Sequence, residues 1–179
     1  RVEEIYNLFV KKLSLFIKYL FETTDFYKNP GNTLDESYKR VMFLKYIIEA
    51  QYCYKIFYPN GEPINRESYL HIMYKLTWFA TVSDVSPETN AGRGPVDFKI
   101  SRSAHDKTLV EFKLASSTKL AQNLQKQVEI YKKAHDTDKA IKVILFFSAE
   151  EEARARKIIA DLGLSNEKYI VLIDARSDN

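Results

Sequence analysis

The spacing of apolar residues changes abruptly near residue 82 of this chain. Before that point, apolar side chains recur every three or four residues, which is the period of a helix that buries one face. After it, short β-type runs alternate with turns that contain Asn, Gly and Asp. A chain of 179 residues can bury one ordinary core. We therefore expect a helical N-terminal region followed by an α/β domain.

The first half contains start and stop signals for three helices. Thr33 followed by Glu36 has the spacing of a capping box, and Asn65 is a candidate N-cap. Clusters of Pro, Asn and Gly end the first two periodic segments. The predicted helices cover residues 2–22, 34–58 and roughly 66–80.

The second half predicts a mixed sheet. Three short strands follow one another as a meander, and the segment from residue 109 to 147 has a strand-helix-strand pattern that predicts a parallel pair with a right-handed crossover. The predicted strands cover residues 85–88, 96–101, 109–114, 141–147 and 169–173, and the predicted helices 118–135 and 149–162. We place the domain boundary between residues 62 and 63, with a helical region at 1–62 and the α/β domain at 63–179.

Asp97 and the segment Glu111-Phe112-Lys113 form the candidate catalytic group. Side chains alternate between the faces of a strand, so Glu111 and Lys113 emerge on one side of theirs. If the two strands pair, two carboxylates and an ammonium converge on one patch. Carboxylates that lie close together repel each other unless a cation such as Mg²⁺ neutralises them. The alternative interpretation is an edge hairpin with ordinary surface charges.

Gln127 and Tyr131 lie on the helix that follows. At about 100° per residue, both fall on the same face as Leu120 and Leu124. A polar amide on an apolar face requires a partner, which is either a neighbouring backbone group or a ligand at the charged patch. We expect Gln127 and Tyr131 to face that patch.

On these residues the chain resembles the PD-(D/E)XK nuclease superfamily over about residues 64–147. Pro95 and Asp97 are similar to its proline and aspartate motif with one inserted residue, and Glu111 and Lys113 are similar to its (D/E)XK motif. Gln127 and Tyr131 resemble the Gln-x-x-x-Tyr motif of its RecB-like branch. The resemblance implies a restriction-endonuclease-like α/β core, with a mixed central sheet flanked by helices, and a Mg²⁺-dependent nuclease in which Mn²⁺ can substitute.

The resemblance also implies further site residues. An additional acid often completes the metal site in this superfamily, and Glu67 and Glu88 qualify by position. Glu67 is alternatively explained by the helix dipole, and Glu88 as a loop charge. The Gly-Arg-Gly segment before Pro95 is similar to the approach loop of such nucleases, which makes Arg93 a candidate phosphate contact.

The charge distribution favours a polyanionic partner. Residues 91–142 hold eleven Lys or Arg against six acids, whereas the whole chain has a net charge of only +3. Lys99 and Lys119 in this segment are candidate nucleic-acid contacts. A Lys-rich solvated surface is the alternative. His71, His105 and His135 share no zinc-site spacing, and we expect them at the surface or in the core.

The sequence also predicts compartment and assembly. A lone cysteine, no secretory leader and no uncharged apolar segment of about 18 residues predict a cytoplasmic protein that does not enter the membrane. The first residue is Arg, so we expect a piece of a longer protein, and a homodimer stays open as the assembly.

The predicted function is metal-dependent hydrolysis of phosphodiester bonds, with DNA as the expected substrate and restriction, defence or DNA processing as the expected role. RNA is the competing substrate. A different class of function is a catalytically silent nuclease-fold module that binds nucleic acid or mediates assembly. A third is a helical protein-interaction domain in which the charged trio is incidental.

Overall fold

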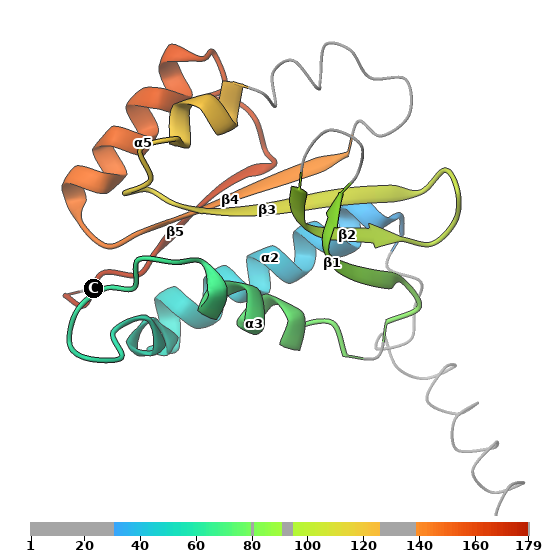
Figure 1. Cartoon of the computed structure of the whole chain (residues 1–179), viewed down its shortest axis with the longest axis horizontal. Helices are drawn as coiled ribbons and strands as arrows, with labels where there is room; N and C mark the ends of the chain where they lie inside the picture. Colours follow the sequence, from blue (N-terminus) through green and yellow to red (C-terminus); the bar gives the residue numbers. More distant parts are fainter. Residues whose placement is uncertain (1–30, 80, 91–94, 126–138, 179) are drawn as a thin grey trace, which may run out of the picture. The chain divides into compact units, whose positions relative to one another are not determined.

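A computed structural model of the chain describes residues 31–79, 81–90, 95–125 and 139–178. Residues Asn32–Asn179 form one compact unit, which Figure 1 shows with its elements labelled. In chain order these are α2 (Thr33–Ala50), the 3₁₀ helix η2 (Cys53–Phe57), α3 (Ser68–Leu76), β1 (Asp84–Asn90), β2 (Pro95–Ser101), β3 (Lys107–Leu114), β4 (Ala140–Phe146), α5 (Ala149–Asp161) and β5 (Ile170–Asp174). The helix predicted over residues 2–22 lies outside the described residues.

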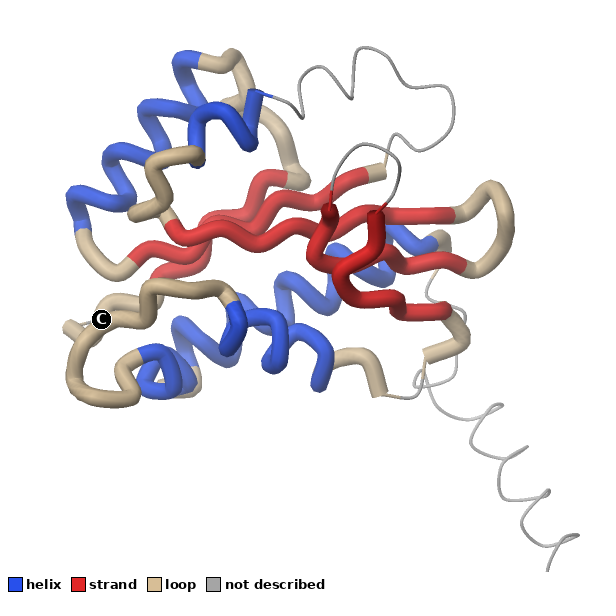
Figure 2. The backbone as a smooth tube through the Cα atoms, in the orientation of Figure 1, coloured by secondary structure: helices blue, strands red, loops and turns tan. Residues whose placement is uncertain are grey.

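A mixed sheet of five strands in the order β1-β2-β3-β4-β5 forms the centre of the unit. β1, β2 and β3 pair antiparallel, whereas β3, β4 and β5 pair parallel, and Figure 2 shows these strands side by side. Residues 120–125, between β3 and β4, are helical. The predicted meander, the parallel pair and the α/β class with a mixed sheet are therefore confirmed.

Helices cover both faces of the sheet, with α2 and α3 on one side and α5 on the other (Figure 1). Every second residue of β3 is buried, and the residues of β4, which are all buried, divide between two cores. Full burial of each large apolar side chain contributes about 1.5–3 kcal/mol. The first core includes Val110 and Phe112 of β3, Val41, Leu44 and Ile48 of α2, and Leu70, Met73 and Tyr74 of α3. The second includes Ala115, Leu120, Leu124, Ile144, Phe146, Ala155 and Ile159.

Helix α2 begins with a cap that differs from the predicted one. Asn32 is the N-cap, and its side chain accepts a hydrogen bond from the Asp35 N–H at 3.0 Å. Thr33 is fully buried, and its Oγ1 donates to Asp106 Oδ1 at 2.8 Å. The predicted capping box of Thr33 and Glu36 is wrong, because partners far along the chain engage both side chains.

The ends of the other predicted helices also differ. Helix α2 ends at Ala50, where Gln51 is the C-cap, and Tyr52 then adopts a left-handed conformation with φ 59° before η2. Helix α3 spans Ser68–Leu76 with Glu67 as its N-cap, and no side chain caps it. Asn65 is therefore not its cap. These boundaries depend on packing more than on local spacing.

Residues on both sides of the boundary expected at residue 62 pack in one core. Val41, Leu44 and Ile48 of α2 are fully buried together with Phe57 of η2 and Phe112 of the sheet. Helix α2 presents its apolar face to the sheet, which explains its strong contribution to this core. The described part of residues 1–62 thus belongs to the compact unit that also contains the sheet.

The Glu36 carboxylate is the centre of a buried polar cluster. Its Oε1 accepts from Arg40 at 2.7 Å and from Thr81 at 2.9 Å, and its Oε2 accepts from Ser83 at 2.7 Å and from Arg102 at 2.6 Å. Burial alone would raise the pKa of Glu36, but these bonds together hold it below its ordinary value. The cluster joins α2 to the segments that flank β1 and β2.

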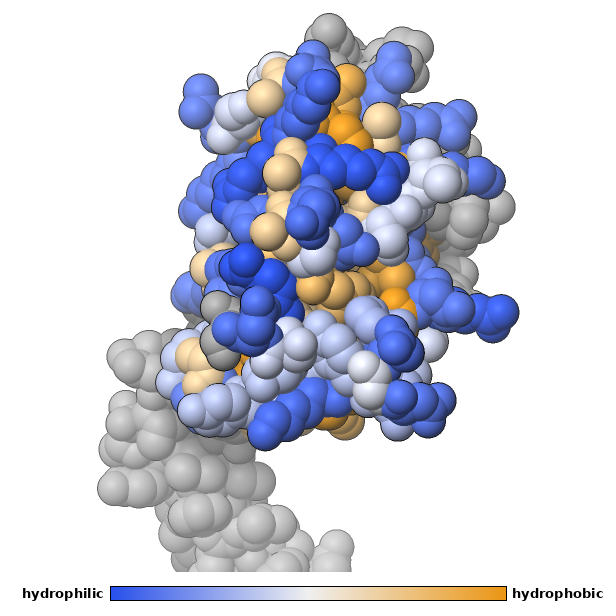
Figure 3. Space-filling model, turned by 90° about the vertical axis from the view of Figure 1, so that its left-hand side faces the viewer, coloured by the Kyte–Doolittle hydropathy of each residue, from blue (hydrophilic) through white to orange (hydrophobic). Residues whose placement is uncertain are grey.

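The surface is mostly hydrophilic on the face that carries the C-terminus, with smaller hydrophobic areas among the polar residues (Figure 3). Exposed apolar side chains occur on the outer faces of the two helices below the sheet, including Phe43 and Tyr46 of α2 and Ile72 and Leu76 of α3. No described helix combines the length and apolar character needed to cross a membrane.

Candidate functional site

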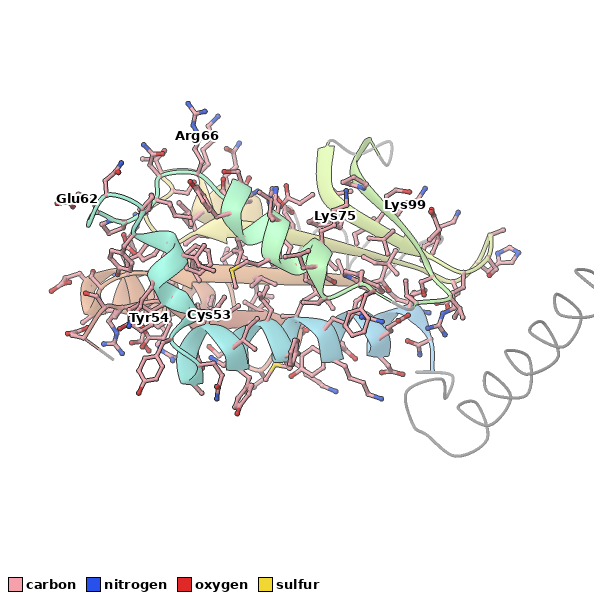
Figure 4. All side chains as sticks on the ribbon, turned by 90° about the horizontal axis from the view of Figure 1, so that it is seen from below. Cys53, Tyr54, Glu62, Arg66, Lys75 and Lys99 are labelled. Atoms are coloured by element: carbon pink, nitrogen blue, oxygen red, sulfur yellow. The ribbon has the colours of Figure 1, made fainter. Side chains whose placement is uncertain are left out.

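The candidate site lies where β2 separates from β3. The β2–β3 ladder ends with the pair Phe98–Val110. One residue earlier on β2, Asp97 Oδ2 accepts a hydrogen bond from the Phe112 N–H, with N and O 2.6 Å apart. β2 stays paired with β1 as far as Pro95, and the view from below in Figure 4 shows the ends of both strands apart from β3. A carboxylate thus satisfies a strand amide in place of a backbone carbonyl.

Asp97, Glu111 and Lys113 are brought together at this point. Lys113 Nζ lies 3.4 Å from Glu111 Oε1 and 3.7 Å from Asp97 Oδ2, and it donates to the Phe112 carbonyl at 2.8 Å. Each of the three side chains is 18–20% exposed. Strand alternation places Glu111 and Lys113 on one side of β3, opposite the buried Phe112. The trio is thus partly buried but within reach of a ligand from solvent.

Lys142 of β4 is a fourth charged residue of this cluster. The parallel register sets it beside Glu111, and its Nζ contacts Glu111 Oε2. Lys142 is only 7% exposed, and burial lowers its pKa to about 8 against the attraction of Asp97. Lys142 was not among the site residues predicted from the sequence. The available signal was a single charge within the otherwise apolar segment Ala140–Phe146.

His71 of α3 also reaches the cluster. Its Nε2 lies 3.5 Å from Asp97 Oδ2, which is at the outer limit of a hydrogen bond. That nitrogen is buried and has no closer hydrogen-bond partner in the described part of the chain. The ring packs against Phe98 and Phe112, with centroids 5.7 and 5.6 Å away. His71 was expected at the surface or in the core, and neither expectation included its approach to Asp97.

The electrostatics of the cluster favour a charged Asp97. Burial alone would raise the pKa of this carboxyl, but His71, Lys113 and the Phe112 amide together hold it below its ordinary value. Two carboxylates, Asp97 and Glu111, face two ammonium groups, Lys113 and Lys142. The four charges therefore balance.

The two candidate additional acids lie in different positions. Glu67 is the N-cap of α3, and its carbonyl accepts from the His71 N–H one turn later at 3.0 Å. In the β1–β2 register, Pro87 pairs with Phe98 and Thr89 with Val96. The backbone of Glu88 is thus at the register position opposite Asp97, whereas Glu67 lies at the start of α3, one turn before His71.

The remaining predicted residues divide into two groups. Lys99 lies on β2, two residues after Asp97, and is partly exposed, whereas Lys119 is exposed just before the helical residues 120–125. In Figure 4, Lys99 projects to the same side of the view as Lys75 and Arg66. The residues predicted at the site that lie outside the described part of the chain are Arg93, Gln127 and Tyr131.

The donor chemistry of the site suits a hard divalent cation. Mg²⁺ is commonly held by one or two carboxylates, with water and substrate phosphates completing its coordination. Asp97 and Glu111 supply two such carboxylates around Lys113. Within the described ranges, no three His, Cys, Asp or Glu side chains are grouped to hold a metal ion. A cation at this pair would therefore take further ligands from water or substrate.

The fold and this cluster define an α/β domain with a charged site at the opening of a mixed sheet. The chain belongs to the family described as Domain of unknown function (DUF8371), whose model matches residues 33–149. The match extends from the start of α2 to the start of α5 and so contains the whole described cluster. No curated protein matches the chain. No solved structure matches it either.

Proposed function

We propose that this protein is a metal-dependent nuclease of the PD-(D/E)XK class, with a restriction-endonuclease-like core, that hydrolyses phosphodiester bonds in DNA. The observation that carries the proposal is the position of Lys113 Nζ, 3.4 Å from Glu111 and 3.7 Å from Asp97. An acid on one strand and an acid and a lysine on the next, meeting where the strands separate, agree with the motifs that the sequence resembles.

The proposed chemistry assigns separate tasks to the residues of the cluster. Asp97 and Glu111 would hold Mg²⁺ or Mn²⁺, with water and substrate oxygens as further ligands, and Glu88 or Glu67 keeps its proposed role as an additional acid. His71 Nε2, 3.5 Å from Asp97 Oδ2, would help to orient that carboxylate. The bound ion supplies positive charge for the phosphodiester oxygens and lowers the pKa of water. Lys113 donates a hydrogen bond from Nζ that orients the attacking water toward phosphorus. Gln127 and Tyr131 keep their proposed role as contacts to water or phosphate.

Positive side chains around the cluster suit a nucleic acid. Lys99 follows Asp97 on β2, and the exposed Lys75 and Arg66 project to the same side of the view as Lys99 in Figure 4, with Arg66 farther from it. Such cations bind phosphates without reading the sequence of the bases. Arg93 and Lys119 remain proposed contacts, and DNA remains the proposed substrate ahead of RNA. Restriction, defence or DNA processing is the proposed role, by family resemblance.

A catalytically silent module is the second candidate function, and one observation favours it. Glu111 contacts two lysines, Lys113 and Lys142, so its charge is neutralised without a metal ion. A nuclease-like domain in this state would bind nucleic acid or mediate assembly and would not cleave.

Cleavage assays distinguish the two candidates. Plasmid, linear duplex, single-stranded DNA and RNA are each incubated with the protein and Mg²⁺ or Mn²⁺. The variants Glu111→Ala and Lys113→Ala are compared with Lys107→Ala, which removes a charge from the same face of β3 outside the cluster. We expect the first two to lower the rate by about 100-fold or more, and Lys107→Ala to retain activity.

The other outcomes are equally informative. Cleavage that persists in Glu111→Ala and Lys113→Ala would exclude this site. Binding of nucleic acid without cleavage by the unmodified protein would support the silent module. Preference among the four substrates would identify DNA or RNA as the target.

A further inference from the structure

Lys142 is in an unusual place for a charged group. It lies in the middle of β4, where all residues are buried, and its neighbours Ile141 and Val143 belong to the first core. A buried ammonium is strongly unfavourable unless an opposite charge pairs with it. The described partner of that ammonium is Glu111 Oε2.

Glu111 is thus held from two sides by lysines of different character. The side chain of Lys142 is 9% exposed and is fixed beside Glu111 by the strand register. Lys113 is 20% exposed and shares its ammonium between Glu111 and Asp97 at distances above 3 Å. Lys113 is thus the more exposed and the more loosely paired of the two ammonium groups, and Lys142 is the more closely held.

Because the charges of the site already balance, the positive charge of Lys142 affects how tightly the site binds a cation. Asp97 and Glu111 are already balanced by Lys113 and Lys142, so a divalent cation adds an excess of two positive charges. Like charges a few ångströms apart in a partly buried site repel strongly. A phosphodiester group brings a negative charge that offsets part of this excess.

We propose that Lys142 is a positioning residue that holds Glu111 by one oxygen. As a fixed internal counter-charge, Lys142 also makes tight binding of a divalent cation at the Asp97–Glu111 pair depend on a bound phosphodiester. This inference rests on the proposed function, because it concerns the same metal site. Free protein binds the cation weakly, and nucleic acid strengthens that binding. Replacement of Lys142 by a neutral side chain relieves the repulsion and weakens the dependence.

Calorimetric titration with Mn²⁺ tests the inference without any cleavage reaction. The unmodified protein is compared with Lys142→Met, Lys142→Arg and the control Lys107→Met. We expect Lys142→Met to bind Mn²⁺ about tenfold more tightly or better, and Lys142→Arg and Lys107→Met to bind as the unmodified protein does. Equal or weaker Mn²⁺ binding by folded Lys142→Met, judged by circular dichroism, would overturn the inference.

A second measurement needs no variant and so covers the case in which Lys142→Met does not fold. The unmodified protein is titrated with Mn²⁺ alone and with a phosphorothioate-linked thymidine dinucleotide, a diester that resists hydrolysis. We expect the dinucleotide to tighten Mn²⁺ binding about fivefold or more. The same titration with an uncharged methylphosphonate-linked dinucleotide should show no such gain. Equal affinity in all three titrations, or no Mn²⁺ binding at all, would contradict the inference.

The proposed function and this inference fail separately. If Mn²⁺ binding behaves as expected but no nucleic acid is cleaved, the role of Lys142 stands and the nuclease proposal falls. If cleavage requires Glu111 but Mn²⁺ binding is unchanged in Lys142→Met, the nuclease proposal stands and the role of Lys142 falls.

Discussion

Two polar clusters lie next to the same sheet, one around Glu36 and one around the Asp97–Glu111 pair. They differ in how completely the carboxylate oxygens are paired. The side chain of Glu36 is 4% exposed, and four side chains donate to it at 2.6–2.9 Å. Asp97 and Glu111 are 18% and 20% exposed, and Lys113 lies 3.7 and 3.4 Å from them. The Phe112 N–H and Lys142 each pair closely with one oxygen of this pair. All the donors of the first cluster are close, whereas the second cluster combines close contacts with longer ones and is more exposed.

The difference separates a structural group from a candidate binding group. A buried carboxylate with all its lone pairs engaged rigidifies the fold and has no capacity for another ligand. Carboxylates with long ion pairs and open sides can exchange a lysine for a cation or a phosphate-bound water. His71 Nε2, which has no close partner within the described residues, adds to this unused capacity. We therefore expect matched substitutions in the two clusters to have opposite effects.

The largest expected effect is that of Asp97→Asn on cleavage. An asparagine oxygen can still accept from the Phe112 N–H, so the fold is retained, whereas the charge that holds the metal is lost. We expect a rate about 1,000-fold lower and a free energy of unfolding within about 1 kcal/mol of the unmodified protein. Single-turnover cleavage and urea denaturation measure the two quantities. A large loss of stability with normal activity would show that Asp97 stabilises the fold and does not serve the site.

Glu36→Gln is the matched change in the cluster around Glu36. It removes a charge that pairs with two arginines in a buried setting, and breaking such a pair destabilises by about 3 kcal/mol. We expect a corresponding fall in the free energy of unfolding, measured by urea denaturation. Cleavage by the fraction that remains folded should be unchanged. If Glu36→Gln abolished cleavage in a fully folded protein, Glu36 would have to be assigned to the site.

His71→Phe tests whether His71 belongs to the cluster around Asp97 and Glu111. The phenyl ring preserves the contacts with Phe98 and Phe112 but removes the nitrogen that faces Asp97. We expect a rate about tenfold lower, equivalent to about 1.4 kcal/mol in the activation barrier, with little change in thermal stability. An unaltered rate would limit His71 to packing.

The smallest expected effect is on the pH dependence of stability. The pKa of Glu36 is lowered from 4.5 in the folded protein, so the unfolded chain takes up its proton first as the pH falls. The stabilisation from Glu36 is therefore complete above the unfolded value and is lost as the pH falls through the lower, folded value.

The stability difference between the unmodified protein and Glu36→Gln should accordingly be constant at neutral pH and shrink below pH 4.5. Urea denaturation of both proteins at a series of acidic pH values measures this difference. A gap that stays constant through this range would show that the charge on Glu36 is not what stabilises the cluster.

The local pattern of the sequence was sufficient for the elements and for part of the site. Helical and strand periods predicted α2, α3, α5 and the five strands, because these periods record which face of each element is buried. The alternation of a strand likewise placed Glu111 and Lys113 on one side of β3. Such features depend on residues that are close along the chain.

The tertiary structure alone decided which distant residues meet. Glu36 pairs with Arg102, 66 residues away, and Thr33 with Asp106, 73 residues away. Both side chains therefore bond to distant partners and do not form the expected capping box. His71 and Lys142 joined the trio through helix packing and strand register. Local spacing specifies which side of an element is buried. The partner that each side chain meets there depends on how the elements pack, because that packing minimises unpaired charge and exposed apolar area over the whole chain.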